Sequence, residues 1–177
     1  MRGGKEAVKR GGLGCDVRRL RPGDGEALAR FYNGLSEASR RTFRPLGWQT
    51  RADVCAKVVE GNVAGTQYDL VAVSHVSPGG GSEIVGWSFV WDLGSEEPNF
   101  GLGVADAWQG QGVGGALMDR VLAGARGAGV SRVYLIVVQD NLVAYGMYAR
   151  RGFVRYGELV GEDGLAYFKM VAELGHG

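Results

Sequence analysis

Residues 108–117 read WQGQGVGGAL and contain four glycines in ten positions. They join an expected strand over residues 99–105 to an expected helix over residues 112–128. Such a turn leaves free backbone N–H groups at a helix start, where the helix dipole adds positive charge, so it predicts a phosphate site. Two spacings overlap here, because Gly-x-Gly-x-x-Gly starts at Gly110 and Gln-x-x-Gly-x-Gly starts at Gln109. A glycine-rich turn with no ligand is a third interpretation.

The order of the other expected elements bears on this choice. Before the turn we expect a strand at residues 15–20, then three helices, from Pro22, within 35–43 and over 50–61, and then strands at 68–76 and 83–93. After the helix at 112–128 we expect a strand at 131–139, a helix at 141–153, and two strands around 161–164. Ser36 and Thr50 are expected N-caps, Gly61 is an expected helix stop, and residues 78–82 an expected turn. The strand at 131–139 is almost continuously apolar, as for a strand covered on both faces.

The predicted fold class is therefore α+β, with a single central β-α-β unit. A dinucleotide-binding fold has its glycine-rich turn in the first β-α-β unit and an acidic residue about 20 positions later. Here three helices and four strands precede the turn, and the next acid at a strand end, Asp140, lies 25 residues after Gly115. This context disfavours the interpretation of the Gly-x-Gly-x-x-Gly spacing from Gly110 as a dinucleotide-binding motif.

The bulk composition describes an ordinary globular protein. The chain has 177 residues, 45% of them hydrophobic and 22% charged, which fits one domain over residues 15–177. A net charge of +1 argues against nucleic-acid binding through bulk charge. Cys15 and Cys55 offer neither a disulfide framework nor zinc spacing. Residues 1–14 are glycine-rich and basic without an apolar signal region, so we expect a flexible segment, a cytosolic protein and no membrane span.

Two motifs together resemble a known family. VADAWQGQGVGGAL, at residues 104–117, is similar to motif A of the GNAT superfamily of acyl-CoA-dependent N-acetyltransferases, and the branch with protein-lysine acetyltransferases is the most similar. The first motif is met by Gln109, Gly112 and Gly114, and the second by Asn141, Ala144, Tyr148, Gly152 and Phe153. The resemblance implies the GNAT fold, a mixed and mostly antiparallel sheet with splayed central parallel strands and flanking helices.

The resemblance also implies a donor, acetyl-CoA, bound between the strands at residues 99–104 and 131–139 without any metal. The pantetheine arm would pair with the backbone of Leu102, Gly103 and Val104. The pyrophosphate would lie on the N–H groups of Gln109, Gly110, Gln111, Gly112, Val113, Gly114 and Gly115. Asn141 would contact the donor, and Tyr148 would hold the leaving thiolate and protonate it. The acceptor would be a primary amine of a small molecule, a peptide N-terminus or a lysine.

The residues of the second motif support this independently. Asn141, Ala144 and Tyr148 are three and four positions apart, so they share one helix face. Asn141 is also a plausible N-cap, and Tyr148 a plausible core aromatic, so both structural interpretations stay open. A phenol with a pKa near 10 is protonated at neutral pH and can act as a general acid.

The sequence offers several candidates for the general base and for the acceptor site. Related lysine acetyltransferases usually have a glutamate on the third strand, where this chain has Asn99. Glu97, Glu96 and His75 are the other candidates, although a solvated turn is the plainer interpretation of Glu97. The helices within residues 22–43 and the loop at 161–164 would shape the acceptor site. Trp48, Trp87 and Trp91 would line an apolar acceptor pocket or belong to the core.

A non-catalytic acyl-CoA sensor is the alternative function, because the expected glutamate is missing. Tyr148 argues against it, since binding alone requires no acid at that position. A homodimer through the last strands is a further expectation.

Overall fold

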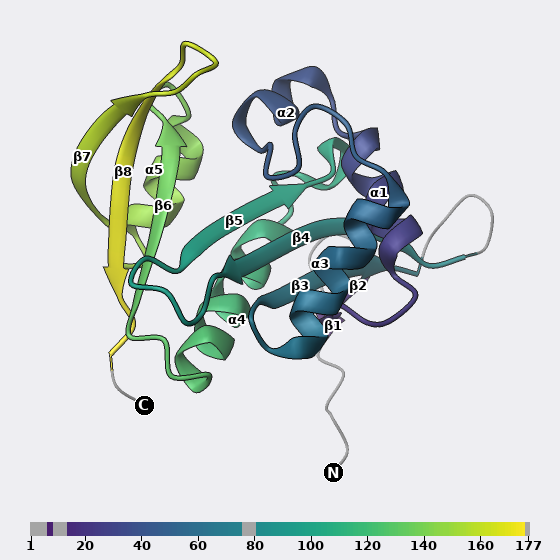
Figure 1. Ribbon diagram of the computed structural model, residues 1–177. Coiled ribbons are helices and arrows are strands. Elements are labelled where there is room, and N and C mark those ends of the chain that lie inside the picture. The colour runs from purple at the N-terminus through teal and green to yellow at the C-terminus, as the bar shows by residue number, and fades with distance from the viewer. Residues whose placement is uncertain (1–6, 9–13, 76–80, 176–177) are drawn as a thin grey trace.

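The structure is a computed structural model that describes residues 7–8, 14–75 and 81–175. It contains one eight-stranded sheet in the order β1-β2-β3-β4-β5-β6-β8-β7, with helices on both faces (Figure 1). The elements are β1 (Ala7–Val8), β2 (Cys15–Arg19), α1 (Gly25–Gly34), α2 (Glu37–Thr42), α3 (Ala52–Ala64), β3 (Tyr68–Ser74), β4 (Glu83–Trp91), β5 (Asn99–Val104), the 3-10 helix η1 (Asp106–Trp108), α4 (Val113–Gly127), β6 (Arg132–Val138), α5 (Leu142–Ala149), β7 (Val154–Val160) and β8 (Ala166–Glu173). The predicted α+β class and element order are confirmed.

The sheet is antiparallel except between its two central strands. β5 and β6 run parallel and share one register pair, Asn99 with Tyr134, after which the strands separate. The separation is visible in Figure 1 as the open angle between these strands. The predicted splayed parallel pair is therefore confirmed.

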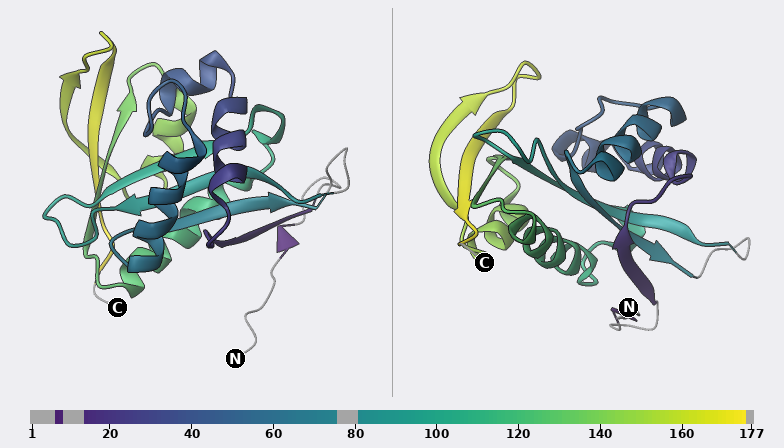
Figure 2. Two further views of the ribbon diagram at one scale, coloured as in Figure 1. Left: turned by 45° about the vertical axis from the view of Figure 1, so that its right-hand side comes forward. Right: turned by 60° about the horizontal axis from the view of Figure 1, so that its bottom comes forward.

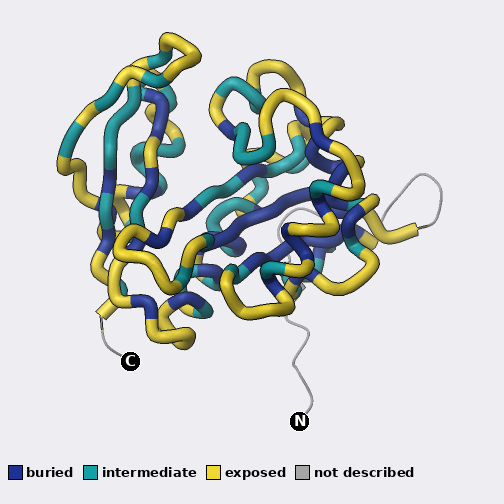
Figure 3. Tube along the Cα trace, viewed as in Figure 1, coloured by how far each residue is buried: buried dark blue, intermediate teal, exposed yellow. Residues whose placement is uncertain are grey.

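Two hydrophobic cores lie on opposite faces of the sheet. The first packs α1 and α3 against β3 and β4, and fully buries Leu28, Tyr32 and Trp87. The second packs α4 against the sheet through Leu117 and Val121, which are both fully buried. Figure 2 shows α1 and α3 on one side of the sheet and α4 on the other, and Figure 3 shows buried positions concentrated on the central strands.

Three details of the helices differ from prediction. Helix α1 begins at Gly25 rather than at Pro22, because Asp24 accepts a hydrogen bond from Arg21 N and a turn forms between them. Helix α3 begins after Arg51, because the Thr50 side chain is buried beside Cys55 rather than capping the helix. The helix continues past Gly61 and ends at Gly65, which adopts a left-handed φ of 77° that a residue without Cβ accepts at low cost. By contrast, Ser36 caps α2 by accepting a hydrogen bond from Ser39 N, as predicted.

The prediction for β6 was half correct. Val133 and Val137 are buried, but Ile136 is 54% exposed because the face away from α4 is uncovered there. The expected flexible segment also needs one amendment, since Ala7–Val8 pairs with β2. The other residues of that segment up to 13, and residues 78–80 of the expected turn, lie outside the described part of the chain.

Candidate active site

A cleft of about 670 Å³ lies where β5 and β6 separate. The following residues line it: Leu35, Ala38, Ser39, Arg41, Thr42 and Phe43 before the sheet, Leu102, Gly103, Val104, Asp106, Gln109, Gly110, Gly112, Gly114 and Gly115 around the glycine-rich turn, and Asp140, Asn141, Val143, Ala144, Met147 and Tyr148 around α5. The cleft thus brings together segments from three separate parts of the chain. Both sequence motifs contribute to its walls.

The edge of β5 that faces the gap offers backbone donors. Ala105 N donates to Val85 O on the β4 side at 2.8 Å, and Tyr134 N donates to Pro98 O on the β6 side at 2.8 Å. Since successive peptide groups of a strand point in opposite directions, the N–H groups of Leu102 and Val104 point toward the gap. These donors lie beyond the register pair that joins β5 to β6.

The glycine-rich turn, residues 109–115, lies at the end of this edge. Gly112 caps α4 with a left-handed φ of 88°, which aims the first turn of the helix into the cleft. A Cβ on Gly114 would be 3.5 Å from Val104 Cγ2, so the turn packs closely on β5. The start of α4 therefore offers N–H groups and the positive end of a helix dipole.

Two predicted donor-binding residues in this turn do not line the cleft with their side chains. Gln111 Nε2 donates to Ala107 O at 2.8 Å, and Val113 is 3% exposed within the core. Their side chains stabilise the turn, and only their backbone N–H groups remain candidates for contact with a ligand.

A polar network joins the turn to α2. Asp106 accepts hydrogen bonds from Ser36 N at 3.0 Å, Ser36 Oγ at 2.5 Å and Ser39 Oγ at 2.9 Å. Gln109 Nε2 donates to Ser39 Oγ and to Val104 O, both at 3.0 Å. The hydrogen bond from Ser36 is the main cause that lowers the pKa of Asp106. The network joins residues about 70 positions apart, and its only local signal in the sequence is the capping Ser36.

Helix α5 forms the opposite wall. Asn141 Oδ1 accepts from Ala144 N at 3.3 Å, so the predicted cap is present. Tyr148 lines the cleft while its ring packs against Phe100 and Phe153, with centroids 5.8 Å and 5.9 Å away. Burial raises the pKa of its phenol to about 12. Tyr148 is therefore both a core aromatic and a cleft residue, and its hydroxyl stays protonated at neutral pH.

Two ion pairs connect the segment around α2 to the other half of the sheet. Arg41 forms two hydrogen bonds with Asp140, at 2.9 Å and 2.8 Å. Arg44 pairs with Asp163 in the turn between β7 and β8, and its guanidinium lies 4.6 Å from the centre of the Trp48 ring. These pairs bring the segment around α2 close to Asp140 and to the turn at residues 161–164, and the contribution of both segments to an acceptor site stays a prediction.

Comparisons with known proteins agree with the fold and with both motifs. Residues 78–153 match the Acetyltransferase (GNAT) family. An acetyltransferase of the GNAT family from Streptococcus pneumoniae has a similar structure, with a TM-score of 0.74, 20% identity, and coverage of 90% of this chain and 98% of that chain. The family match covers less than half of this chain, and the chain shares its fold with this acetyltransferase.

Two further proteins are similar to this chain. A putative acetyltransferase from Salmonella typhimurium, solved with acetyl-CoA, gives a TM-score of 0.76 at 19% identity, and covers 92% of this chain and 95% of that chain. A mycothiol acetyltransferase from Geodermatophilus obscurus is 39% identical over 75 residues, which are 40% of this chain and 24% of that protein. The chain thus spans about a quarter of the curated relative that it matches.

Three of the candidate bases lie away from the cleft. Asn99 is exposed and its Nδ2 donates to Asp92 Oδ2 at 3.3 Å. Glu97 is exposed in the turn before β5, at the end where β5 and β6 are still joined. His75 pairs with Asp16 of β2 at 2.8 Å, two strands away from the gap. None of these three lines the cleft.

The three tryptophans do not form one pocket. Trp87 is fully buried, Trp91 is half-buried beside it, and Trp48 is 52% exposed.

In the described part of the chain, no cluster of three potential metal ligands occurs. None of the helices described there is both long and apolar enough to cross a lipid bilayer.

Proposed function

We propose that this protein transfers the acetyl group of acetyl-CoA to a primary amine by direct attack of the amine on the thioester. The acceptor would be a small molecule, a peptide N-terminus or a lysine. The observation that supports this most strongly is Tyr148, a protonated phenol that faces the splayed edge of β5 across one cleft. The solved relative with acetyl-CoA supports the choice of donor.

The donor would lie along the cleft in an extended form. Leu102 and Val104 would offer backbone N–H groups to the pantetheine arm, in the manner of strand addition. The turn at residues 109–115 would hold the pyrophosphate, because α4 begins there and Gly112 and Gly114 leave room for it. Asn141 lines the same cleft and would contact the donor from the side of α5.

The proposed reaction forms one bond to the thioester carbon, breaks another, and moves two protons. The amine nitrogen forms a bond to the thioester carbon, and a backbone N–H on the edge of β5 that faces the gap would stabilise the oxyanion. The carbon–sulfur bond then breaks, and Tyr148 donates its proton to the thiolate. The amine loses its proton to water, and the tyrosinate is reprotonated from solvent.

No free carboxylate is placed to act as the general base. Asp106 accepts three hydrogen bonds and Asp140 is bonded to Arg41, and these contacts hold the pKa of each carboxyl below its ordinary value. Among the described residues these two are the carboxylates that line the cleft. We therefore expect the amine to enter in its neutral form, so that kcat/KM rises with pH through the pKa of the acceptor itself.

The decisive experiment measures release of the CoA thiol with a panel of amines, for wild type, Tyr148→Phe and the control Tyr145→Phe. Tyr145 lies on the same helix but packs against Phe168 outside the cleft. Tyr148→Phe should lower kcat by about 100-fold, the lower end of general-acid effects. It should leave the Kd for acetyl-CoA within about threefold, a change of under 1 kcal/mol. Tyr145→Phe should have little effect.

Unchanged turnover in Tyr148→Phe would contradict the assignment of the acid. Binding of acetyl-CoA without turnover of any amine would instead favour the non-catalytic sensor. A homodimer through the last strands and a cytosolic location stay predictions, and the exposed Val154, Tyr156 and Val160 of β7 are where we propose the dimer contact.

A further inference from the structure

Asp69, on β3, has an unusual position for a charged residue. Its side chain is fully buried, and it is the single buried acid or base among the described residues. Its Oδ1 accepts hydrogen bonds from Trp87 Nε1 at 2.9 Å and from Trp91 Nε1 at 3.1 Å. Its Oδ2 has no hydrogen-bond partner. An ionised carboxylate is costly in such a place unless it has a function or a compensating partner.

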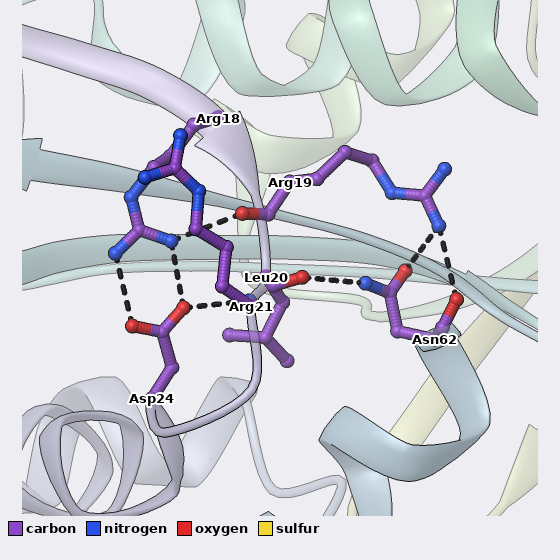
Figure 4. A network of polar contacts seen from close by, with 6 residues as sticks. All are labelled: Arg18, Arg19, Leu20, Arg21, Asp24 and Asn62. Atoms are coloured by element: carbon purple, nitrogen blue, oxygen red, sulfur yellow. Dashed lines mark hydrogen bonds and ion pairs between the residues drawn. The ribbon is translucent and has the colours of Figure 1, made fainter. Parts of the chain in front are cut away.

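Arg19 is the cation whose charge acts on Asp69, but its guanidinium binds other groups. Arg19 Nη2 donates to Asn62 Oδ1 at 2.7 Å and to Asn62 O at 3.1 Å, as Figure 4 shows, and its guanidinium lies 4.0 Å from the centre of the Tyr68 ring. Asn62 on α3 also accepts from the backbone N–H of Asp69 at 2.9 Å. The groups around Asp69 are thus an arginine on β2, an amide on α3 and two indoles on β4.

The two indoles belong to a row of rings that reaches the active-site strand. Asp69 is opposite Phe89, with Trp87 and Trp91 two residues to either side along β4. The Phe89 ring stacks on Trp91 at 4.0 Å between centroids and lies 4.9 Å from Trp87. A Cβ on Gly101 would overlap the Phe89 ring, so this ring lies directly against β5.

A second ring extends the row along β5. Phe43, which lines the cleft, occupies the space that a Cβ on Gly103 would need, and its ring is 5.8 Å from that of Trp87. The peptide groups around Leu102, which would hold the donor, are therefore supported from behind by these rings. We propose that Asp69 is a positioning residue for acetyl transfer, which holds this aromatic row against β5 through the indole N–H groups of Trp87 and Trp91.

This role rests on the proposed acetyltransferase function, and it depends on pH. Burial raises the pKa of Asp69 to about 7, and Arg19 is the one charge that opposes this rise. Hydrogen bonds to an ionised acceptor are roughly twice as strong as those to a neutral one. The row is therefore held more firmly above neutral pH than below it. An asparagine keeps one acceptor oxygen for the indoles but never becomes charged.

The experiment compares wild type, Asp69→Asn and the control Asp53→Asn. Asp53 is exposed in the first turn of α3 and pairs with Arg51. Tryptophan fluorescence of the free protein is measured from pH 5 to pH 9, and kcat/KM is measured over the same range with an amine that the wild type acetylates. The Kd for acetyl-CoA is measured by calorimetry as a check on the turn at residues 109–115.

Wild type and Asp53→Asn should show a fluorescence transition near pH 7, and Asp69→Asn should lack it. Asp69→Asn should have a kcat/KM about tenfold below wild type at pH 8 but within about twofold at pH 6, because the wild-type carboxyl is then mostly neutral. Its Kd for acetyl-CoA should change less than its kcat/KM, since only the contacts at β5 are affected and the pyrophosphate site is not touched. Trp91→Phe keeps an aromatic ring but loses the indole N–H, so it should also lower kcat/KM.

A fluorescence transition that survives in Asp69→Asn, or parallel pH profiles of kcat/KM in the variant and wild type, would overturn the proposal. An inactive wild type would refute the acetyltransferase function itself, and with it the role of Asp69 in transfer. The two failures are thus distinguished, because one appears only in the variant and the other already in the wild type.

Discussion

Replacing Asp69 by Asn should change how the stability of the protein depends on pH. The pKa of the buried carboxyl is about 7 in the folded protein, against 3.8 for an ordinary aspartate. Between these two values the unfolded chain releases the proton while the folded protein keeps it. The free energy of unfolding therefore falls as pH rises through this window, and the contribution of Asp69 is lost above about pH 7.

The magnitude follows from the pKa. Each unit of pKa corresponds to 1.36 kcal/mol, so the interval between pH 5 and pH 7 amounts to about 3 kcal/mol. For a chain of this length, that corresponds to a difference of roughly 6 to 12 °C in Tm. Asparagine does not titrate, so Asp69→Asn should lack this part of the pH dependence.

The assay is urea unfolding followed by circular dichroism at pH 5 and pH 8, for wild type, Asp69→Asn and Asp53→Asn. Other carboxyls titrate as well, so the informative quantity is the difference between variant and wild type at each pH. This difference should shift by about 3 kcal/mol in favour of Asp69→Asn on going from pH 5 to pH 8. Parallel behaviour of Asp69→Asn and wild type would refute the reasoning, and Asp53→Asn should not reproduce the shift.

Three further predictions concern the cleft. Gly112→Ala should destabilise the protein by about 1 to 2 kcal/mol in urea unfolding, because Gly112 has a left-handed φ of 88°. The same variant should weaken acetyl-CoA binding in calorimetry, and unchanged affinity would argue against the turn as the phosphate site. Gly114→Val should weaken that binding further, because its side chain would take up room that the glycine leaves for the phosphates. Its Tm should change little, since the added Cβ would be 3.5 Å from Val104 Cγ2, an ordinary contact distance. Arg41→Ala should leave Tm nearly unchanged, because its pair with Asp140 is exposed, but should increase hydrogen exchange in α2, which has no buried residue. Equal exchange in α2 of wild type and variant would show that the pair does not hold the helix.

Local patterns were sufficient for most of the fold and for half of the site. Apolar periodicity located the helices and strands, and the capping chemistry of Ser36 and Asn141 is present in the structure. The glycine spacing from Gln109 and the helical spacing from Asn141 to Tyr148 marked two walls of one cleft. These features depend on residues close together in the chain, where steric preference and backbone hydrogen bonding determine the conformation.

Contacts between distant segments required the tertiary structure. Thr50 does not cap α3 because its side chain is buried beside Cys55, and Ile136 is exposed because no helix covers that face of β6. The candidate bases Glu97 and His75 are excluded by the strand order rather than by their own chemistry.

By itself, therefore, the sequence determined the class of fold, two motifs similar to those of GNAT proteins and the position of the glycine-rich turn. Only the tertiary structure decided that Asp106 binds the start of α2, and that Asp69 is buried under two indoles whose ring row supports β5. The physical reason is that the energy of a buried charge and the geometry of a cleft depend on which strands become neighbours. A pattern along the chain does not contain that information when the partners are far apart in sequence.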